Sequence, residues 1–171
     1  EVEDLPALNE AADLQLRLWI GDNYEAKLNA AQEEGDIGAL TVLRGHATLG
    51  KSLTLSEFSN VFKRRAALMR EWNFFFEKYP VVLMPVSADL PFEDNYDLKS
   101  LDAFERVWKA QIPQIGTPFM GLPGLSVFTG FDNTTPTGVQ VVANRFREDL
   151  CLDVGNIIER SFGAPPLADV T

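Results

Sequence analysis

The clearest pattern of apolar positions lies in residues 55–79, where large apolar side chains recur at steps of three and four. Such spacing places them on one face of an α-helix. Thr54 and Glu57 have the spacing of a capping box, in which each side chain serves a free backbone N–H of the first turn. Pro80 lacks the N–H that would continue the helix. We therefore predict a long helix with a stripe that is apolar except for Arg65: Phe58, Val61, Phe62, Arg65, Met69, Trp72, Phe76 and Tyr79.

Two shorter helices are predicted before it. Residues 11–20 show helical periodicity, and Gly21 tolerates the left-handed backbone that commonly ends a helix. Asp22 is expected to cap a second helix that extends through residue 34. The apolar run at residues 40–43 is compatible with a strand or with a helical turn, because periodicity cannot separate the two at this length.

The second half of the chain alternates helices with short apolar strands. Helices are predicted at residues 101–111, ended by Pro113, and at residues 148–161. A polar turn joins the last two strands and permits them to pair antiparallel. This alternation predicts an α/β fold in which helices pack on a short mixed sheet. The predicted strands cover residues 81–84, 125–128 and 138–143.

Charge and composition narrow the classes of partner. The chain of 171 residues carries a net charge of −10, and an acidic surface opposes binding to nucleic acid. No apolar run approaches the roughly 18 residues of a membrane span, so no membrane partner is expected. The single cysteine, Cys151, excludes an internal disulfide and fits a reducing, cytoplasmic location.

One motif offers an alternative chemistry. Residues 45–52, Gly-His-Ala-Thr-Leu-Gly-Lys-Ser, match the pattern of a phosphate-binding loop, in which Lys51 would neutralise phosphates and Ser52 would coordinate magnesium. However, the long helix is capped at Thr54 rather than within the motif, and the strand at residues 81–84 ends in a proline rather than an aspartate. We favour a chance match and keep nucleotide binding as an alternative.

Other candidate groups lack partners of the right type. His46 is the only histidine, and any Ser-His or Cys-His mechanism would require it. One histidine with one cysteine also argues against a structural zinc site. We therefore expect no metal and no cofactor.

The sequence of residues 114–142 points to a protein family more specifically than these motifs do. A Gly-Thr-Pro segment at 116–118 is followed by Gly-Leu-Pro-Gly-Leu-Ser-Val at 121–127 and by Pro-Thr-Gly-Val-Gln-Val-Val at 136–142. We expect a Gly/Pro-punctuated turn, a strand, a polar turn and a second strand. These segments, together with residues 53–58 and 75–85, follow one another in the order found in the amidase signature family. The sequence therefore resembles the C-terminal portion of that family.

The resemblance implies an α/β fold and hydrolysis of carboxamide C–N bonds. It further implies a serine nucleophile activated through a second serine and a lysine, all in an N-terminal Gly/Ser-rich segment that this sequence does not contain. We therefore expect residues 1–171 to form a single C-terminal segment that lacks the catalytic part, has no catalytic residue of its own and is inactive alone.

Within that interpretation, the segment supplies scaffold and part of the pocket for a small-molecule amide. The residues predicted to contact substrate are Trp108, Gln111, Ile115 and Thr117, although the apolar pattern of this stretch, taken alone, favours a core over a pocket. Apolar faces and strand edges left without their other half would favour self-association or pairing with an N-terminal half. A non-catalytic interaction domain is the remaining alternative.

Overall fold

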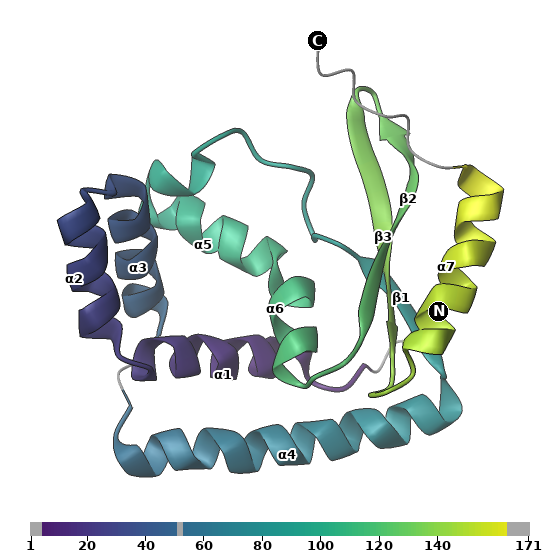
Figure 1. Ribbon diagram of the computed structural model, residues 1–171, viewed down its shortest axis with the longest axis horizontal. Coiled ribbons are helices and arrows are strands. Elements are labelled where there is room, and N and C mark those ends of the chain that lie inside the picture. Colours follow the sequence, from purple (N-terminus) through teal and green to yellow (C-terminus); the bar gives the residue numbers. More distant parts are fainter. Residues whose placement is uncertain (1–4, 51–52, 164–171) are drawn as a thin grey trace.

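The computed structural model describes residues 5–50 and 53–163. A helical part and a sheet part lie side by side, with the long helix α4 running beneath both (Figure 1). The elements, in chain order, are α1 (Leu8–Gly21), α2 (Tyr24–Glu34), α3 (Ile37–Leu49), α4 (Leu55–Lys78), β1 (Val81–Pro85), the 3-10 turn η1 (Tyr96–Leu98), α5 (Leu101–Ala110), α6 (Ile112–Phe119), β2 (Gly124–Asp132), β3 (Thr135–Ala143) and α7 (Glu148–Phe162).

The sheet has the strand order β1-β3-β2, and both pairings are antiparallel. Leu83 pairs with Val141 on one side, and Gly124 pairs with Val142 on the other. The predicted antiparallel hairpin is confirmed. The expectation of a mixed sheet is corrected for the described residues, because β1 and β2 both run antiparallel to β3; the two-residue turn between β2 and β3 imposes this direction on the second pair.

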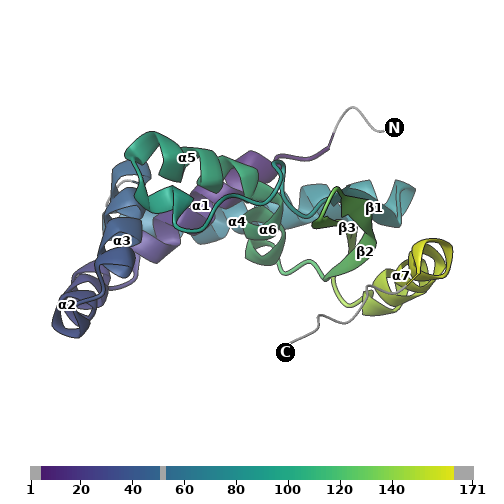
Figure 2. The ribbon, with the colours of Figure 1, turned by 90° about the horizontal axis from the view of Figure 1, so that it is seen from above.

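Helices cover both faces of this sheet (Figure 2). Val141 and Ala143 pack with Cys151 of α7, whereas Val142 packs with residues of α1, α4 and the α6–β2 region. Successive side chains of a strand point to opposite faces, so the apolar residues 141–143 at the end of β3 contribute to two separate cores, one on each face of the sheet. The end of β3 is therefore buried on both faces, whereas parts of β1 and β2 are exposed.

Helix α4 confirms the strongest sequence prediction. Thr54 Oγ1 accepts a hydrogen bond from the Glu57 N–H at 3.3 Å, and a Glu57 carboxylate oxygen accepts one from the Thr54 N–H at 2.8 Å. The buried residues of the helix are Val61, Leu68, Trp72 and Phe76. Leu68 is absent from the predicted stripe, and Phe62 is 49% exposed. Among the described residues, no helix combines the length and apolar character that crossing a bilayer requires.

Near the start of the chain, the structure decides between two open alternatives and corrects one prediction. Residues 40–43 lie inside α3, so the helical alternative holds and the strand does not. Asp22 is not an N-cap: Asn23 occupies that position with φ 55°, and Asp22 instead pairs with Lys27 at 3.3 Å. A left-handed asparagine turns the chain sharply between α1 and α2, which leaves Asp22 on the wrong side of the turn to cap α2.

Residues 116–118 lie in helix α6 rather than in the turn that the sequence predicts. Pro113 sits in the first turn of this helix, where a missing N–H costs nothing. Pro118 lies inside the helix, one residue before its end, and it cannot donate the N–H that would bond to the Gln114 carbonyl, so α6 lacks one of its i→i−4 hydrogen bonds. The segment rich in glycine and proline therefore forms a short helix of eight residues, which is followed by a turn at Gly121 with φ 70°.

Candidate functional site

Trp108 and Ile115 of the predicted site belong to a core cluster between helices. Trp108 is 9% exposed and packs with Ile115 and with residues of α1. Its ring lies edge-on to those of Trp19 and His46, at centroid distances of 6.0 and 5.3 Å. A hollow of about 340 Å³ between α1 and α5 also contacts Trp108. The arrangement explains the burial of Trp108 without a ligand.

Thr117 belongs to a buried polar network. Its hydroxyl donates to the Pro113 carbonyl at 2.7 Å and accepts from Gln140 Nε2 at 3.4 Å. Gln114 Nε2 in turn donates to Gln140 Oε1 at 2.7 Å and to the Val86 carbonyl at 3.1 Å. The network joins α6, β3 and the segment after β1. Sequence reasoning missed Gln140, although an amide flanked by valines on a predicted strand signals a buried polar partner.

The structure therefore does not gather the four predicted residues around one hollow. Gln111 is exposed between α5 and α6, and the other three are buried. Their contact with substrate stays a prediction.

His46 supports a testable pH dependence. Burial among Trp19, Phe104 and Trp108 lowers the pKa of its imidazole below 6.5. The unfolded chain then binds the proton more readily, so the stability contributed by neutral His46 is present above pH 6.5 and is lost as the pH falls towards the folded pKa. We expect the urea midpoint to decrease from pH 7.5 to pH 5.5. His46→Phe should reduce this decrease, because most carboxylates titrate lower; an equal decrease in both proteins would contradict the assignment.

A second region lies where the segment after β1 faces the β2–β3 hairpin. We call this the loop hollow; it has a volume of about 470 Å³. Its lining combines apolar side chains with the hydroxyls of serine and threonine, and Asp89 is its single charged residue. The lining residues are Val86, Ser87, Asp89, Leu90, Pro91, Ser126, Phe128, Pro136, Thr137 and Gly138.

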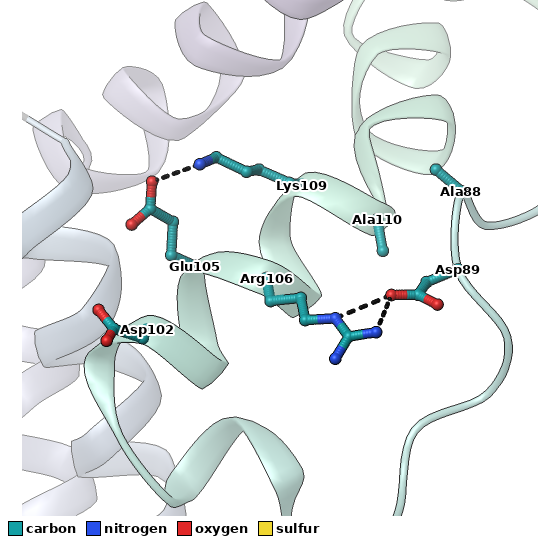
Figure 3. A pocket seen from close by; sticks show the side chains of 7 residues that line it. All are labelled: Ala88, Asp89, Asp102, Glu105, Arg106, Lys109 and Ala110. Atoms are coloured by element: carbon teal, nitrogen blue, oxygen red, sulfur yellow. Dashed lines mark hydrogen bonds and ion pairs between the residues drawn. The ribbon is translucent and has the colours of Figure 1, made fainter.

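A third region, the charged hollow, lies between α5 and the same segment and measures about 480 Å³ (Figure 3). Arg106 reaches across the gap, and its Nε and Nη2 donate to Asp89 Oδ2 at 2.9 and 2.7 Å. Lys109 pairs with Glu105 at 2.7 Å along the helix. These pairs neutralise most of the charge that lines the hollow. Asp89 contacts both hollows and forms part of the wall between them.

Stacked rings extend this attachment. Phe92 and Tyr96 stack at 5.2 Å, and the Arg106 guanidinium lies 5.5 and 5.9 Å from their centroids. The Ala88 N–H donates to the Ala110 carbonyl at 2.8 Å. The segment after β1 is thus fixed to α5 by backbone, ionic and ring contacts together.

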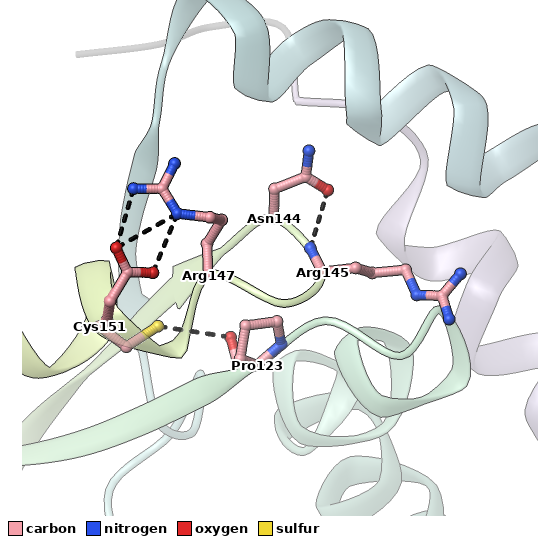
Figure 4. Close-up of polar contacts among 6 residues, drawn as sticks. Pro123, Asn144, Arg145, Arg147 and Cys151 are labelled. Atoms are coloured by element: carbon pink, nitrogen blue, oxygen red, sulfur yellow. Dashed lines mark hydrogen bonds and ion pairs between the residues drawn. The ribbon is translucent and has the colours of Figure 1, made fainter.

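The single cysteine, Cys151, lies in the first turn of α7, next to the corner that follows β3 (Figure 4). The Cys151 thiol is buried, and its sulfur lies 3.7 Å from the Pro123 carbonyl oxygen. Burial raises the pKa of this thiol, which opposes the thiolate form that a nucleophile requires. Arg147 pairs with Asp149 at 2.9 Å, while the Arg145 side chain extends away from that pair. Cys151 is a packing residue here.

The phosphate-loop alternative loses its structural context. Residues 45–49 form the end of helix α3, and the residues before them, 37–44, belong to the same helix rather than to the strand that a phosphate-binding loop follows. A Cβ at Gly45 would lie 2.8 Å from the Phe104 ring, so this glycine permits close packing of α3 on α5. Lys51 and Ser52 lie outside the described residues. In the described part of the chain, no three His, Cys, Asp or Glu side chains gather as a metal site would require.

Comparison with known proteins decides the family. The model of the family described as Amidase matches residues 21–152. This chain belongs to the amidase family. The match includes α4, the whole sheet and the segment that lines both hollows, so the amidase assignment rests on most of the structure.

Curated relatives of this amidase-family chain agree. An indoleacetamide hydrolase from Bradyrhizobium japonicum is 34% identical over 70% of the chain, which spans 26% of that relative. A glutamyl-tRNA(Gln) amidotransferase subunit from Archaeoglobus fulgidus is 28% identical over 82% of the chain, which spans 30% of it. The chain therefore spans less than a third of either relative, and it matches their C-terminal part.

Solved structures confirm the fold. A 6-aminohexanoate cyclic dimer hydrolase superposes with a TM-score of 0.71 at 16% identity, covering 95% of this chain and 38% of its own. The corresponding amidotransferase subunit from Thermotoga maritima superposes with a TM-score of 0.55 at 18% identity, covering 93% and 40%. The predicted α/β fold, as part of the amidase fold, is confirmed.

Proposed function

We propose that this chain is the C-terminal segment of an enzyme that hydrolyses carboxamide C–N bonds, and that it supplies scaffold and part of the substrate pocket. The observation that carries the proposal is the 34% identity to an indoleacetamide hydrolase over most of the chain. A small aromatic amide is the substrate class that this relative suggests. The predicted pocket residues Trp108, Gln111, Ile115 and Thr117 remain part of the proposal.

The chemistry of the described residues supports placing bond cleavage outside this segment. His46 is enclosed by aromatic rings, and Cys151 is a buried thiol with a raised pKa. Across residues 5–50 and 53–163, no hydrogen bond joins a serine hydroxyl to a lysine amine. A nucleophile and its base need such contact, which supports the proposal that the catalytic groups lie in another part of the enzyme.

Pairing with an N-terminal half is the second part of the proposal. The outer edge of β1 has no partner strand among the described residues, and Leu83 on that strand is 57% exposed. On α7, Leu152 and Ile157 are also exposed. Free strand edges and exposed apolar side chains are typical of surfaces that another segment covers. The free thiol of Cys151 supports the further proposal of a cytoplasmic location.

A graft tests this function directly. The chain would replace the matching C-terminal part of the Bradyrhizobium japonicum indoleacetamide hydrolase, and ammonia release from indole-3-acetamide would be measured. Because the chain supplies the missing scaffold, we expect a rate about ten-fold or more above that of the truncated relative. The truncated relative and the chain alone are the controls. A graft that folds by circular dichroism yet equals the truncated relative would contradict the proposal.

A further inference from the structure

We infer that the loop hollow binds the apolar, aryl-sized end of an uncharged amide; this deepens the proposed function and rests on it. The volume of about 470 Å³ lies within the range of small-molecule sites. Five lining residues present apolar side chains, and they come from both walls. These are Val86, Leu90 and Pro91 on one wall and Phe128 and Pro136 on the other.

The charge of the hollow selects against ionic ligands. Asp89 is its only charged lining residue, and both carboxylate oxygens are already engaged. Oδ2 accepts two hydrogen bonds from Arg106, and Oδ1 accepts one from the Leu90 N–H at 3.1 Å. A cationic ligand would have to displace Arg106, and an anionic ligand would face the carboxylate. An uncharged ligand avoids both costs.

Arg106 acts as a positioning residue for this site. It stands in the charged hollow, outside the loop hollow, yet it fixes Asp89 and lies over Phe92 and Tyr96. Two further hydrogen bonds hold the same wall of the hollow: the Val86 carbonyl accepts one from Gln114 of α6, and the Ala88 N–H donates one to the Ala110 carbonyl of α5. Removing Arg106 would free the Asp89 carboxylate and change the charge that a ligand meets.

Ser126 supplies a polar point beside this apolar lining. It is exposed on β2, and its hydroxyl makes no hydrogen bond within the described part of the chain. A hydroxyl can donate to an amide carbonyl or accept from an amide N–H. A few polar groups in an apolar hollow are the usual means of orienting a ligand. An aryl amide satisfies both features of the lining.

The test uses the 171-residue chain and three probes that share one ring: phenylacetamide, phenethylamine and phenylacetate. Titration followed by NMR is expected to show saturable binding of phenylacetamide and weaker binding of the two ions. Phe128→Ala should weaken phenylacetamide binding roughly ten-fold, because a buried ring contact is lost. Leu90→Ala, at a position that is 55% exposed, should weaken it in the same direction.

Arg106→Gln gives the sharper result. We expect it to raise the affinity for phenethylamine about ten-fold and to lower that for phenylacetamide, because the Asp89 carboxylate becomes available to a cation. Lys109→Gln is the matched control, since Lys109 lies on the same helix but pairs with Glu105. If Arg106 had only a structural role, Arg106→Gln would lower the affinity for phenethylamine and for phenylacetamide together.

Several results would overturn the inference: no saturable binding of phenylacetamide, equal binding of all three probes, or unchanged affinity in folded Phe128→Ala and Leu90→Ala chains. An unchanged ion preference in Arg106→Gln would also overturn it. None of these results bears on whether the graft hydrolyses indole-3-acetamide. A graft without activity, combined with normal binding of the probes to the chain, would overturn the amidase proposal alone.

Discussion

Replacing Trp72 by alanine is expected to lower the free energy of unfolding by about 3–5 kcal/mol. Trp72 is 0% exposed and packs among Leu68, Phe76 and Met84, where α4 meets the sheet. Removing the indole leaves a cavity that the neighbouring residues can fill only in part. Domains of this size are typically stable by about 5–15 kcal/mol, so the loss is a large share. Urea unfolding followed by far-UV circular dichroism measures it.

The indole nitrogen makes Trp72→Phe the informative companion. Trp72 Nε1 is buried with no hydrogen-bond partner among the described residues. Phenylalanine removes that unsatisfied donor and keeps most of the ring, so we expect a loss clearly smaller than for alanine. Phe74→Ala, at a 69% exposed position on the same helix, is the control and should change stability little. Equal losses for Trp72→Ala and Phe74→Ala would refute the core placement.

Gly116→Ala is expected to destabilise the chain by about 1–3 kcal/mol through overpacking. A Cβ at Gly116 would lie 2.6 Å from Leu8 Cδ1 and 2.9 Å from the Leu8 carbonyl oxygen. The side chain can move, but the backbone oxygen belongs to α1 and cannot move without shifting that helix. Thermal and urea unfolding of the variant measure the effect.

Gly38→Ala in α3 is the matched control for Gly116. Its Cβ would meet only side-chain atoms: Leu98 at 3.7 Å and, at 3.2 Å, Asp36 Oδ1, which accepts the capping hydrogen bond from the Ala39 N–H and needs to shift by only a few tenths of an ångström. Alanine in a helix is otherwise favoured over glycine by roughly 0.5–1 kcal/mol. We therefore expect Gly38→Ala to be neutral or slightly stabilising. A similar gain at Gly116 would show that α1 and α6 are not in close contact.

Much of the fold was predictable because local signals agreed with burial. The capping box and the stripe of α4 specify the helix on their own, and only Leu68 and Phe62 were misplaced. Helix α6 was not predictable from the Gly-Thr-Pro segment, because glycine and proline favour a turn locally. Its packing against α1 at Gly116 overrides that preference.

The candidate site was harder to predict, for a physical reason. Trp108 and Ile115 were expected near substrate because they are aromatic and aliphatic, but those properties report burial first. The loop hollow brings residues 86–91 against residues 126–138 through long-range packing. No spacing in the sequence encodes that contact, and the Asp89–Arg106 pair, which fixes the first of these segments to α5, joins residues 17 positions apart.

The strand order has a consequence for synthesis of the chain. The strand made last, β3, occupies the middle of the sheet, so β1 and β2 share no hydrogen bonds with each other. When Pro85 leaves the ribosome, β1 must wait for residues 86–134 before its partner exists. A chain interrupted before Thr135 would hold two unpaired strands beside the apolar face of α4. A nascent chain that ends within this range therefore exposes unpaired strand edges and apolar surface, which are the features that make folding intermediates prone to aggregation.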